Sequence, residues 1–203
     1  MTETDDRHLL LELPDVRYES SFLEGAAEFA EEERLDSTYA RALGYDLQAL
    51  RCDFRTYVWD IKRLGEKSEH GYVDIVHWLI ERGEYIGQAS VRPDLATPYL
   101  ITYGGHIGYS IRPSRRGQGY GKLILKLALE KSRRVGLDRV LITCDADNLA
   151  SKRIIENNGG QFETAMKMDA HTRRMEGREG VAELDKLRYW IDLGDLPHPR
   201  SIL

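Results

Sequence analysis

The sequence predicts a single α/β domain with a mixed sheet and helices on both faces. Two β-rich runs, 74–81 and 85–91, are separated by a short turn and indicate an antiparallel hairpin. Farther along, a strand at 106–111, a glycine loop, an amphipathic helix and an apolar strand at 139–144 follow one another. This order is typical of a β-α-β unit, so the two strands should run parallel.

The N-terminal part predicts one short strand and two helices. Residues 8–13 have the pattern of the strand. Ser21 is followed three residues later by Glu24, which is the pattern of a capping box, so we expect a helix to begin there. Gly44 interrupts the next segment, and 53–64 has apolar residues at the spacing of a second helix.

The C-terminal part predicts one more helix and two more strands. Residues 93–102 are irregular and lead into the central strand. Gly136 is placed to end the central helix, because glycine favours the left-handed conformation that follows a helix. A short helix is expected over 150–157, with strands around 162–168 and 187–192.

Composition and charge exclude several classes of protein. A net charge of −5 does not suit a nucleic-acid binder. No run of about 18 apolar residues is present, so we expect no membrane span. The first residues are polar and acidic, unlike a signal peptide, so we expect a cytoplasmic protein. Cys52 and Cys144 have no metal-ligand spacing, so no metal is expected.

The stretch 106–131 carries most of the chemical information. Its loop reads Arg-Arg-Gly-Gln-Gly-Tyr-Gly-Lys over residues 115–122 and opens the central helix. A strand, a glycine loop and a helix N-terminus together favour an anion, because backbone N–H groups converge there and the helix dipole attracts negative charge. The flanking arginines and lysine would help to neutralise a polyanion.

Three other interpretations of the loop were weighed. A Walker A loop has four residues between its first glycine and a Gly-Lys pair followed by Ser or Thr. Here three residues separate Gly117 from Gly121, and Leu123 follows Lys122, so that interpretation fails. A dinucleotide fingerprint requires Gly-x-Gly-x-x-Gly, which the loop lacks. A plain glycine turn without a ligand stays possible.

The loop resembles a motif of the GNAT superfamily of N-acetyltransferases. Residues 116–121 match its Arg/Gln-x-x-Gly-x-Gly/Ala pattern, and 148–151 resemble its Asn-x-x-Ser. The resemblance covers residues 104–162. The chain is also similar to a bacterial branch of the superfamily, through its Gly-Gly-His-Ile-Gly-Tyr strand and a late Arg-Tyr-Trp-Ile strand.

The resemblance implies an acyl-CoA N-acyltransferase fold over the whole chain, 1–203. Its single, mostly antiparallel sheet would be splayed at the central parallel pair near Gly108, which opens a cleft for a thioester. The motif region would be 104–162, and the helices within 21–64 would frame the acceptor site.

The resemblance also implies a site for acetyl-CoA and no metal. The central strand would pair with the pantetheine arm, and the glycine loop would wrap the pyrophosphate. Gly119 and Gly121 would permit close approach, since a Cβ would intrude. Lys122 or Arg115 would meet further phosphate charge. The expected cofactor residues are Tyr109, Ser110, Ile111, Arg115, Arg116, Gly117, Gln118, Gly119, Tyr120, Gly121, Lys122, Asn148 and Ser151.

The sequence has several candidate catalytic groups. Many relatives have a tyrosine acid seven residues after the motif asparagine, where this chain has Ile155. His106 is the candidate general base, or else a histidine hydrogen-bonded within the sheet. Tyr109 is a candidate proton donor, or else a packing aromatic. Weaker candidates are His77, Glu84, Asp145 and Asp147.

The expected activity is direct acetyl transfer to an amine of a small molecule or protein, without a covalent acyl-enzyme. No nucleic-acid or membrane partner is expected, and the protein would be a monomer or homodimer. Ile155 supports an alternative, a non-catalytic acyl-CoA-binding sensor or scaffold. Aromatic residues that would line the acceptor pocket, or else pack in the core, are Tyr57, Trp59, Tyr72 and Trp78.

Overall fold

The computed structural model describes residues 9–66, 71–169, 172, 174 and 185–194. The two ends of the predicted 1–203 domain therefore lie outside the described residues.

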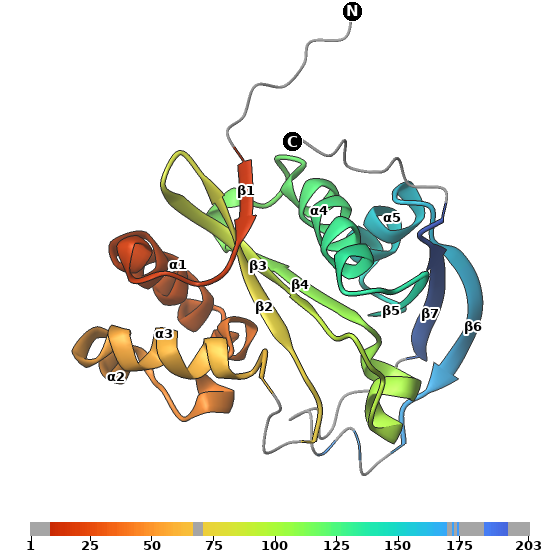
Figure 1. The fold of residues 1–203 in the computed structure, drawn as a ribbon, viewed down its shortest axis with the longest axis horizontal. Helices are drawn as coiled ribbons and strands as arrows, with labels where there is room; N and C mark the ends of the chain where they lie inside the picture. The colour runs from red at the N-terminus through yellow and green to blue at the C-terminus, as the bar shows by residue number, and fades with distance from the viewer. Residues whose placement is uncertain (1–8, 67–70, 170–171, 173, 175–184, 195–203) are drawn as a thin grey trace, which may run out of the picture.

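The described strands form two hydrogen-bonded sheets, and all of their strand pairs are antiparallel (Figure 1). One sheet has the order β1-β2-β3-β4, with β1 at Leu9–Glu12, β2 at Ile75–Glu81, β3 at Glu84–Val91 and β4 at Ile107–Ile111. The other has the order β5-β7-β6, with β5 at Arg139–Asp145, β6 at Gln161–Lys167 and β7 at Asp185–Asp192. The predicted hairpin is confirmed as β2 and β3.

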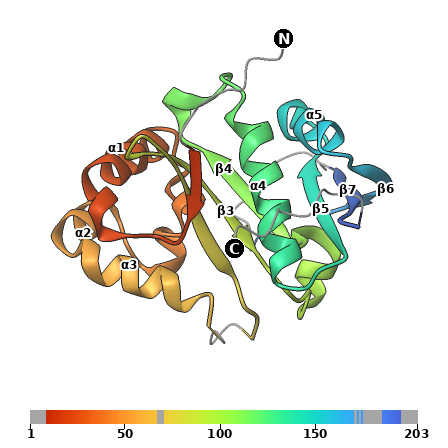
Figure 2. The same ribbon diagram turned by 45° about the horizontal axis from the view of Figure 1, so that its top comes forward.

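Helices cover both faces of the first sheet, as predicted (Figure 2). On one side lie α1 at Glu19–Glu31, α2 at Leu47–Cys52 and α3 at Phe54–Arg63. On the other side lie α4 at Tyr120–Arg134 and α5 at Leu149–Asn157. Each side has its own core. Phe22 stacks on Trp78 with ring centroids 4.5 Å apart in the first, and Ile124 and Leu125 are fully buried in the second.

The expected parallel pairing of β4 with β5 is not formed among the described residues, where the two strands meet only beside an antiparallel bridge between Gly105 and Ile142. At one end the N–H of His106 donates to the Leu141 carbonyl at 2.8 Å, and the N–H of Leu141 donates to Nδ1 of His106 at 2.8 Å. Gly105 allows this approach, because a Cβ there would lie 2.6 Å from the Leu141 carbonyl oxygen. Beyond this point the described strands share no ladder, which divides the sheet in two.

Local signals predicted some element ends and misplaced others. The capping box at Ser21 is wrong, because α1 begins at Glu19 and the Ser21 hydroxyl instead accepts from the N–H of Tyr85 at 2.9 Å. The sequence analysis did not predict α2, whose N-terminus is capped by Asp46. The segment expected to be irregular ends in a π-helical turn at Leu100–Gly104.

Gly136 ends α4 as predicted. Its φ is +88°, and its N–H donates to the Arg133 carbonyl while the N–H of Leu137 donates to Ser132. These paired bonds form a Schellman motif, which satisfies carbonyls at the end of the helix. The glycine therefore fixes the turn from α4 into β5.

Candidate active site

One cleft of about 320 Å³ lies where α1, β4, the glycine loop and α5 meet, and we call it the cofactor-side cleft. It brings together most of the residues that the motif comparison predicted. Those lining it are Tyr109, Ser110, Ile111, Arg115, Arg116, Gly117, Gly121, Asn148 and Ser151. Gln118, Gly119, Tyr120 and Lys122 belong to the adjoining loop and first helical turn but are not among its lining residues.

The glycine loop presents unused backbone donors at the start of α4. Within the described part of the chain, the N–H groups of Gly117, Gln118, Gly119 and Gly121 donate no hydrogen bond. Gly119 is the N-cap residue with a φ of +86°, a conformation that costs a residue with a side chain about 1–2 kcal/mol. Free donors at the positive end of a helix dipole form an anion site.

Gly121 also has a role in helix packing, beside the predicted one at the cofactor. A Cβ at this position would lie 2.5 Å from Cδ1 of Ile154, on α5. The missing side chain therefore lets α4 and α5 pack closely at the edge of the cleft. No such contact exists at Gly119, where a Cβ would meet nothing within 4 Å of the described structure.

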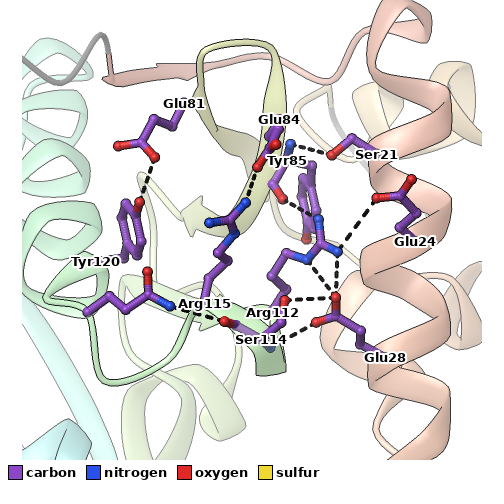
Figure 3. Close-up of polar contacts among 11 residues, drawn as sticks. Ser21, Glu24, Glu28, Glu81, Glu84, Tyr85, Arg112, Ser114, Arg115 and Tyr120 are labelled. Carbon is purple, nitrogen blue, oxygen red and sulfur yellow. Dashed lines mark hydrogen bonds and ion pairs between the residues drawn. The ribbon is translucent and has the colours of Figure 1, made fainter.

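The entrance to the loop is braced from α1 by one carboxylate (Figure 3). Glu28 accepts from Nε of Arg112 at 3.0 Å, from the N–H of Ser114 at 2.9 Å and from its hydroxyl at 2.8 Å. Burial alone would raise the pKa of Glu28, but these hydrogen bonds outweigh it and hold the pKa below its usual value. Arg112 also donates to the Tyr85 carbonyl at 3.2 Å, so the brace reaches β3.

The arginines of the motif are already neutralised by acidic side chains. Arg115 forms an ion pair with Glu84 (Figure 3). Arg116 binds both carboxylate oxygens of Glu32, at 2.8 and 2.9 Å. These pairs hold the loop against its neighbours, so its backbone donors are the main anion ligands that it provides.

A second cleft of about 260 Å³ opens on the other side of Tyr109, and we call it the acceptor-side cleft. Its wall is more polar than apolar and comes from distant parts of the chain. Residues of its wall include Tyr72, Arg92, Gly108, Tyr103, Thr143, Cys144, Asp145 and Lys186. The two clefts share Tyr109, Asn148 and Ser151, so they meet at the splayed strands.

Tyr109 has an unsatisfied hydroxyl at this junction. The oxygen is buried and has no hydrogen-bond partner in the described structure. Burial raises the pKa of Tyr109 to about 12, while the nearby Ser151 lowers it in part without meeting the hydroxyl at bonding geometry. A buried, unpaired hydroxyl calls for an explanation, and its position between two clefts makes Tyr109 a candidate ligand contact.

The Asn-x-x-Ser motif shapes the far wall of the junction. Asn148 caps α5 by accepting from the N–H of Ser151 at 3.0 Å. Ile155, at the position where many relatives have a tyrosine, is fully buried in the core beneath α5. Its side chain therefore reaches neither cleft.

His106 is held in the sheet. Its side chain is buried, lines neither cleft, and uses Nδ1 to accept from Leu141. Burial lowers its pKa, so the ring is neutral at pH 7. Of the weaker candidates, Asp145 alone lines a cleft; His77 is buried in β2, and Glu84 is paired with Arg115.

Of the four aromatic residues considered for the acceptor pocket, Tyr72 alone lines the acceptor-side cleft. Tyr57 and Trp78 are fully buried in the core, and Trp59 is exposed beside Arg63. Arg92, which was not predicted from the sequence, lies in this cleft and is held by Asp74 and Tyr39. No local pattern identifies it, because the three residues come from separate segments.

Among the described residues, no helix is long and apolar enough to cross a membrane. In the same part of the chain, no group of three or more His, Cys, Asp or Glu side chains is placed to hold a metal ion.

A comparison with curated proteins found no matching sequence. A comparison with solved structures found proteins with a similar fold. Solved structures with a similar fold include Mycobacterium smegmatis RimJ in complex with CoA-disulfide, at 19% identity and a TM-score of 0.62, covering 93% of this chain and 84% of that one. The microcin C7 self-immunity acetyltransferase MccE, in complex with acetyl-CoA and AMP, has 18% identity, a TM-score of 0.60 and 93% coverage of both chains.

A third similar structure is a Salmonella typhimurium acetyltransferase that modifies the N-terminal serine of ribosomal protein L7/L12. It has 19% identity and a TM-score of 0.57, covering 91% of this chain and 94% of that one. The acetyltransferase (GNAT) domain family matches residues 19–161, which include α1 to α5 and the whole cofactor-side cleft. The chain therefore belongs to the GNAT family of acetyltransferases.

Proposed function

We propose that the protein transfers the acetyl group of acetyl-CoA to a primary amine of a small molecule or protein. The observation that carries this proposal is the meeting of two clefts at Tyr109. One cleft has free backbone donors suited to a pyrophosphate, and the other has a polar wall suited to an amine. A direct transfer in a ternary complex needs both ligands bound at the same time with their reacting groups adjacent.

The residues present fit coenzyme A. Gly117, Gln118, Gly119 and Gly121 would hold the pyrophosphate through their N–H groups. The exposed edge of β4 beyond the last contact with β5 would hold the pantetheine arm as an added strand. Acetyl-CoA supplies an activated acyl group, and the chain supplies its position and a proton.

Tyr109 is the proposed proton donor to the leaving thiolate. A pKa of about 12 keeps its hydroxyl protonated at neutral pH, as a general acid must be. Tyr109 would replace the tyrosine acid that many relatives have at the position of Ile155, whose side chain is apolar and buried. The hydroxyl lies between the clefts and has no competing partner in the described structure.

Cys144 also lines the acceptor-side cleft, but it does not suit an acyl-enzyme. Burial is the main reason that the pKa of its thiol is raised to about 11, so the thiol is protonated at neutral pH. A thiol is a weak nucleophile in that form. This supports direct transfer. In this mechanism His106 positions β4 against β5 and does not act as the general base.

One specific observation favours a second function, a non-catalytic acyl-CoA-binding module. The residue at the position of the usual tyrosine acid, Ile155, is buried and apolar. A sensor would bind acetyl-CoA in the cofactor-side cleft without turnover.

The oligomeric state, monomer or homodimer, and the cytoplasmic location are predictions from the sequence.

Calorimetry with acetyl-CoA, followed by a thiol-release assay over a panel of amines, tests the proposal. We expect binding of acetyl-CoA and amine-dependent release of free thiol. Binding without turnover on any amine would favour the sensor, and absence of binding would overturn both functions.

A further inference from the structure

The acceptor-side cleft has a guanidinium with an unused donor. Arg92 donates through Nη1 to the Gly105 carbonyl at 3.2 Å and through Nη2 to the Tyr39 hydroxyl at 3.3 Å. Nη2 also lies 3.2 Å from a carboxylate oxygen of Asp74. The Nε–H is buried and has no acceptor in the described structure. The side chain is thus fixed in place with one donor unpaired.

Asp74 holds Arg92 from behind. Its side chain is only 4% exposed and is not among the residues that line the cleft. The same carboxylate oxygen accepts from the Tyr39 hydroxyl at 2.7 Å. Gly108 packs against the guanidinium, since a Cβ there would lie 3.5 Å from Nη2 of Arg92. Arg92 therefore lines the cleft while its counter-ion Asp74 does not.

The opposite wall of the cleft has a second cation. Lys186 on β7 forms an ion pair with Asp145 on β5 at 3.0 Å, and the side chains are 12% and 16% exposed. Among the described lining residues, Arg92 and Lys186 are thus cations and Asp145 is the one carboxylate. Each cation has a carboxylate partner, Asp74 for Arg92 and Asp145 for Lys186, and the two pairs differ in that Asp145 lines the cleft and Asp74 does not.

We infer that the acceptor is an amine that also has a carboxylate, as a small α-amino acid does. The carboxylate would bind Arg92 as a charge-assisted pair, and the amine would face Tyr109. Arg92 packs against Gly108, the residue next to Tyr109, and all three line one cleft. Because Arg92 and Tyr109 line the same small cleft, a molecule in which one carbon joins the two groups would present one group to each residue. This inference rests on the proposed acetyl transfer.

The same charges disfavour other acceptors. A polyamine or a lysine-rich protein surface would bring further cations and no carboxylate for the unpaired Nε–H of Arg92. A cleft of about 260 Å³ also suits a small molecule.

Matched acceptors test the inference on the wild-type protein. Each α-amino acid is compared with its carboxamide and with the amine that lacks the carboxyl group, in a thiol-release assay with saturating acetyl-CoA. We expect kcat/KM to fall at least about tenfold from acid to amide, because a charged hydrogen bond is lost. Calorimetry on CoA-loaded protein should give the same order of affinities.

Variants assign the effect to Arg92. The double variant Arg92→Gln with Asp74→Asn removes both charges together, so no unpaired charge stays buried. In this double variant, kcat/KM for each α-amino acid should be close to kcat/KM for its carboxamide. Arg51→Gln removes an exposed cation on α2 and should leave the ratio of these two kcat/KM values unchanged. Thermal unfolding of each variant shows whether it is folded.

The outcomes separate this inference from the function on which it rests. Equal or better turnover of carboxamides, polyamines or lysine peptides would overturn the inference and leave the acetyltransferase intact. Acetyl-CoA binding without turnover of any carboxylate-bearing amine would also overturn it. Failure to bind acetyl-CoA would overturn the proposed function itself.

Discussion

The two clefts that meet at Tyr109 are built by different means. The cofactor-side cleft relies on a short continuous stretch, from β4 through the glycine loop into α4, and its ligands are mostly backbone N–H groups. The acceptor-side cleft relies on side chains from separate segments, including Tyr72, Arg92, Asp145 and Lys186. The groups that would bind a molecule there are therefore side chains from positions scattered along the sequence.

This difference explains why one cleft is recognisable in the sequence and the other is not. A backbone site needs glycines at fixed spacing, since the chain must turn sharply and leave its donors free. A side-chain site needs only that the fold brings its residues together, which leaves no local pattern. All three arginines are ion-paired, Arg115 with Glu84, Arg116 with Glu32 and Arg92 with Asp74, and Arg92 differs in that its buried Nε–H has no acceptor in the described structure.

Gly119→Glu should give the largest loss of cofactor binding. The variant puts a carboxylate and a strained φ of +86° where a pyrophosphate would bind. We expect acetyl-CoA affinity to fall at least about 100-fold by calorimetry. Gly44→Glu is the matched control, because Gly44 has a φ of +85° and equal free space far from the loop. If Gly119→Glu kept wild-type affinity, the backbone cradle would be wrong.

Tyr109→Phe tests the junction of the clefts. We expect kcat to fall about 100-fold with acetyl-CoA affinity nearly unchanged, because the variant removes a general acid and keeps the ring. Tyr45→Phe is the control, since burial also raises the pKa of Tyr45 to about 12 but its hydroxyl bonds Asp60 away from both clefts. With a pKa of about 12, Tyr109 should cause no loss of rate between pH 7 and 9. Wild-type turnover in Tyr109→Phe would remove it from the mechanism.

His106→Ala should reduce stability more than chemistry. Loss of its Nδ1 leaves the buried N–H of Leu141 without an acceptor, at a cost of about 1–3 kcal/mol in the free energy of unfolding. Burial lowers the folded pKa of His106, so its contribution is complete above an unfolded pKa of about 6.5 and is lost as pH falls below it.

Urea titrations of the wild type and His106→Ala, compared between pH 5 and 8, measure this effect. The stability difference should shrink toward pH 5. A tenfold drop in kcat with no loss of stability would instead restore His106 as the general base.

Gly121→Val should give a smaller effect on stability. The added side chain would crowd Ile154, which lies 2.5 Å from the position of a Cβ, at a cost of about 1–2 kcal/mol. Ile154→Ala should destabilise the wild type and relieve the crowding in Gly121→Val. Additive losses in this double-mutant cycle would exclude close packing of α4 on α5 as the reason for glycine.

The parts of the structure that depend on local sequence were predictable. The β2–β3 hairpin, the Gly136 helix end and the residues around the glycine loop all follow from patterns within a few residues. The capping box predicted at Ser21 is wrong because the hydroxyl of Ser21 accepts a hydrogen bond from the N–H of Tyr85, which is 64 residues away. The roles of long-range contacts were not visible in the sequence.

Two site residues show the same limit. Gly121 lines the cofactor-side cleft, but its neighbour Ile154 comes from another helix, so the packing of α4 on α5 at this glycine was not predicted. Arg92 was missed altogether, because Asp74 and Tyr39 identify it only after folding.

A crystal structure of the protein with acetyl-CoA tests the central claim most directly. We predict the pyrophosphate on the N–H groups of 117–121 and the thioester sulfur within about 3.5 Å of the Tyr109 hydroxyl. The acetyl group should face the acceptor-side cleft. Coenzyme bound away from the glycine loop, or a thioester pointing away from Tyr109, would contradict the account.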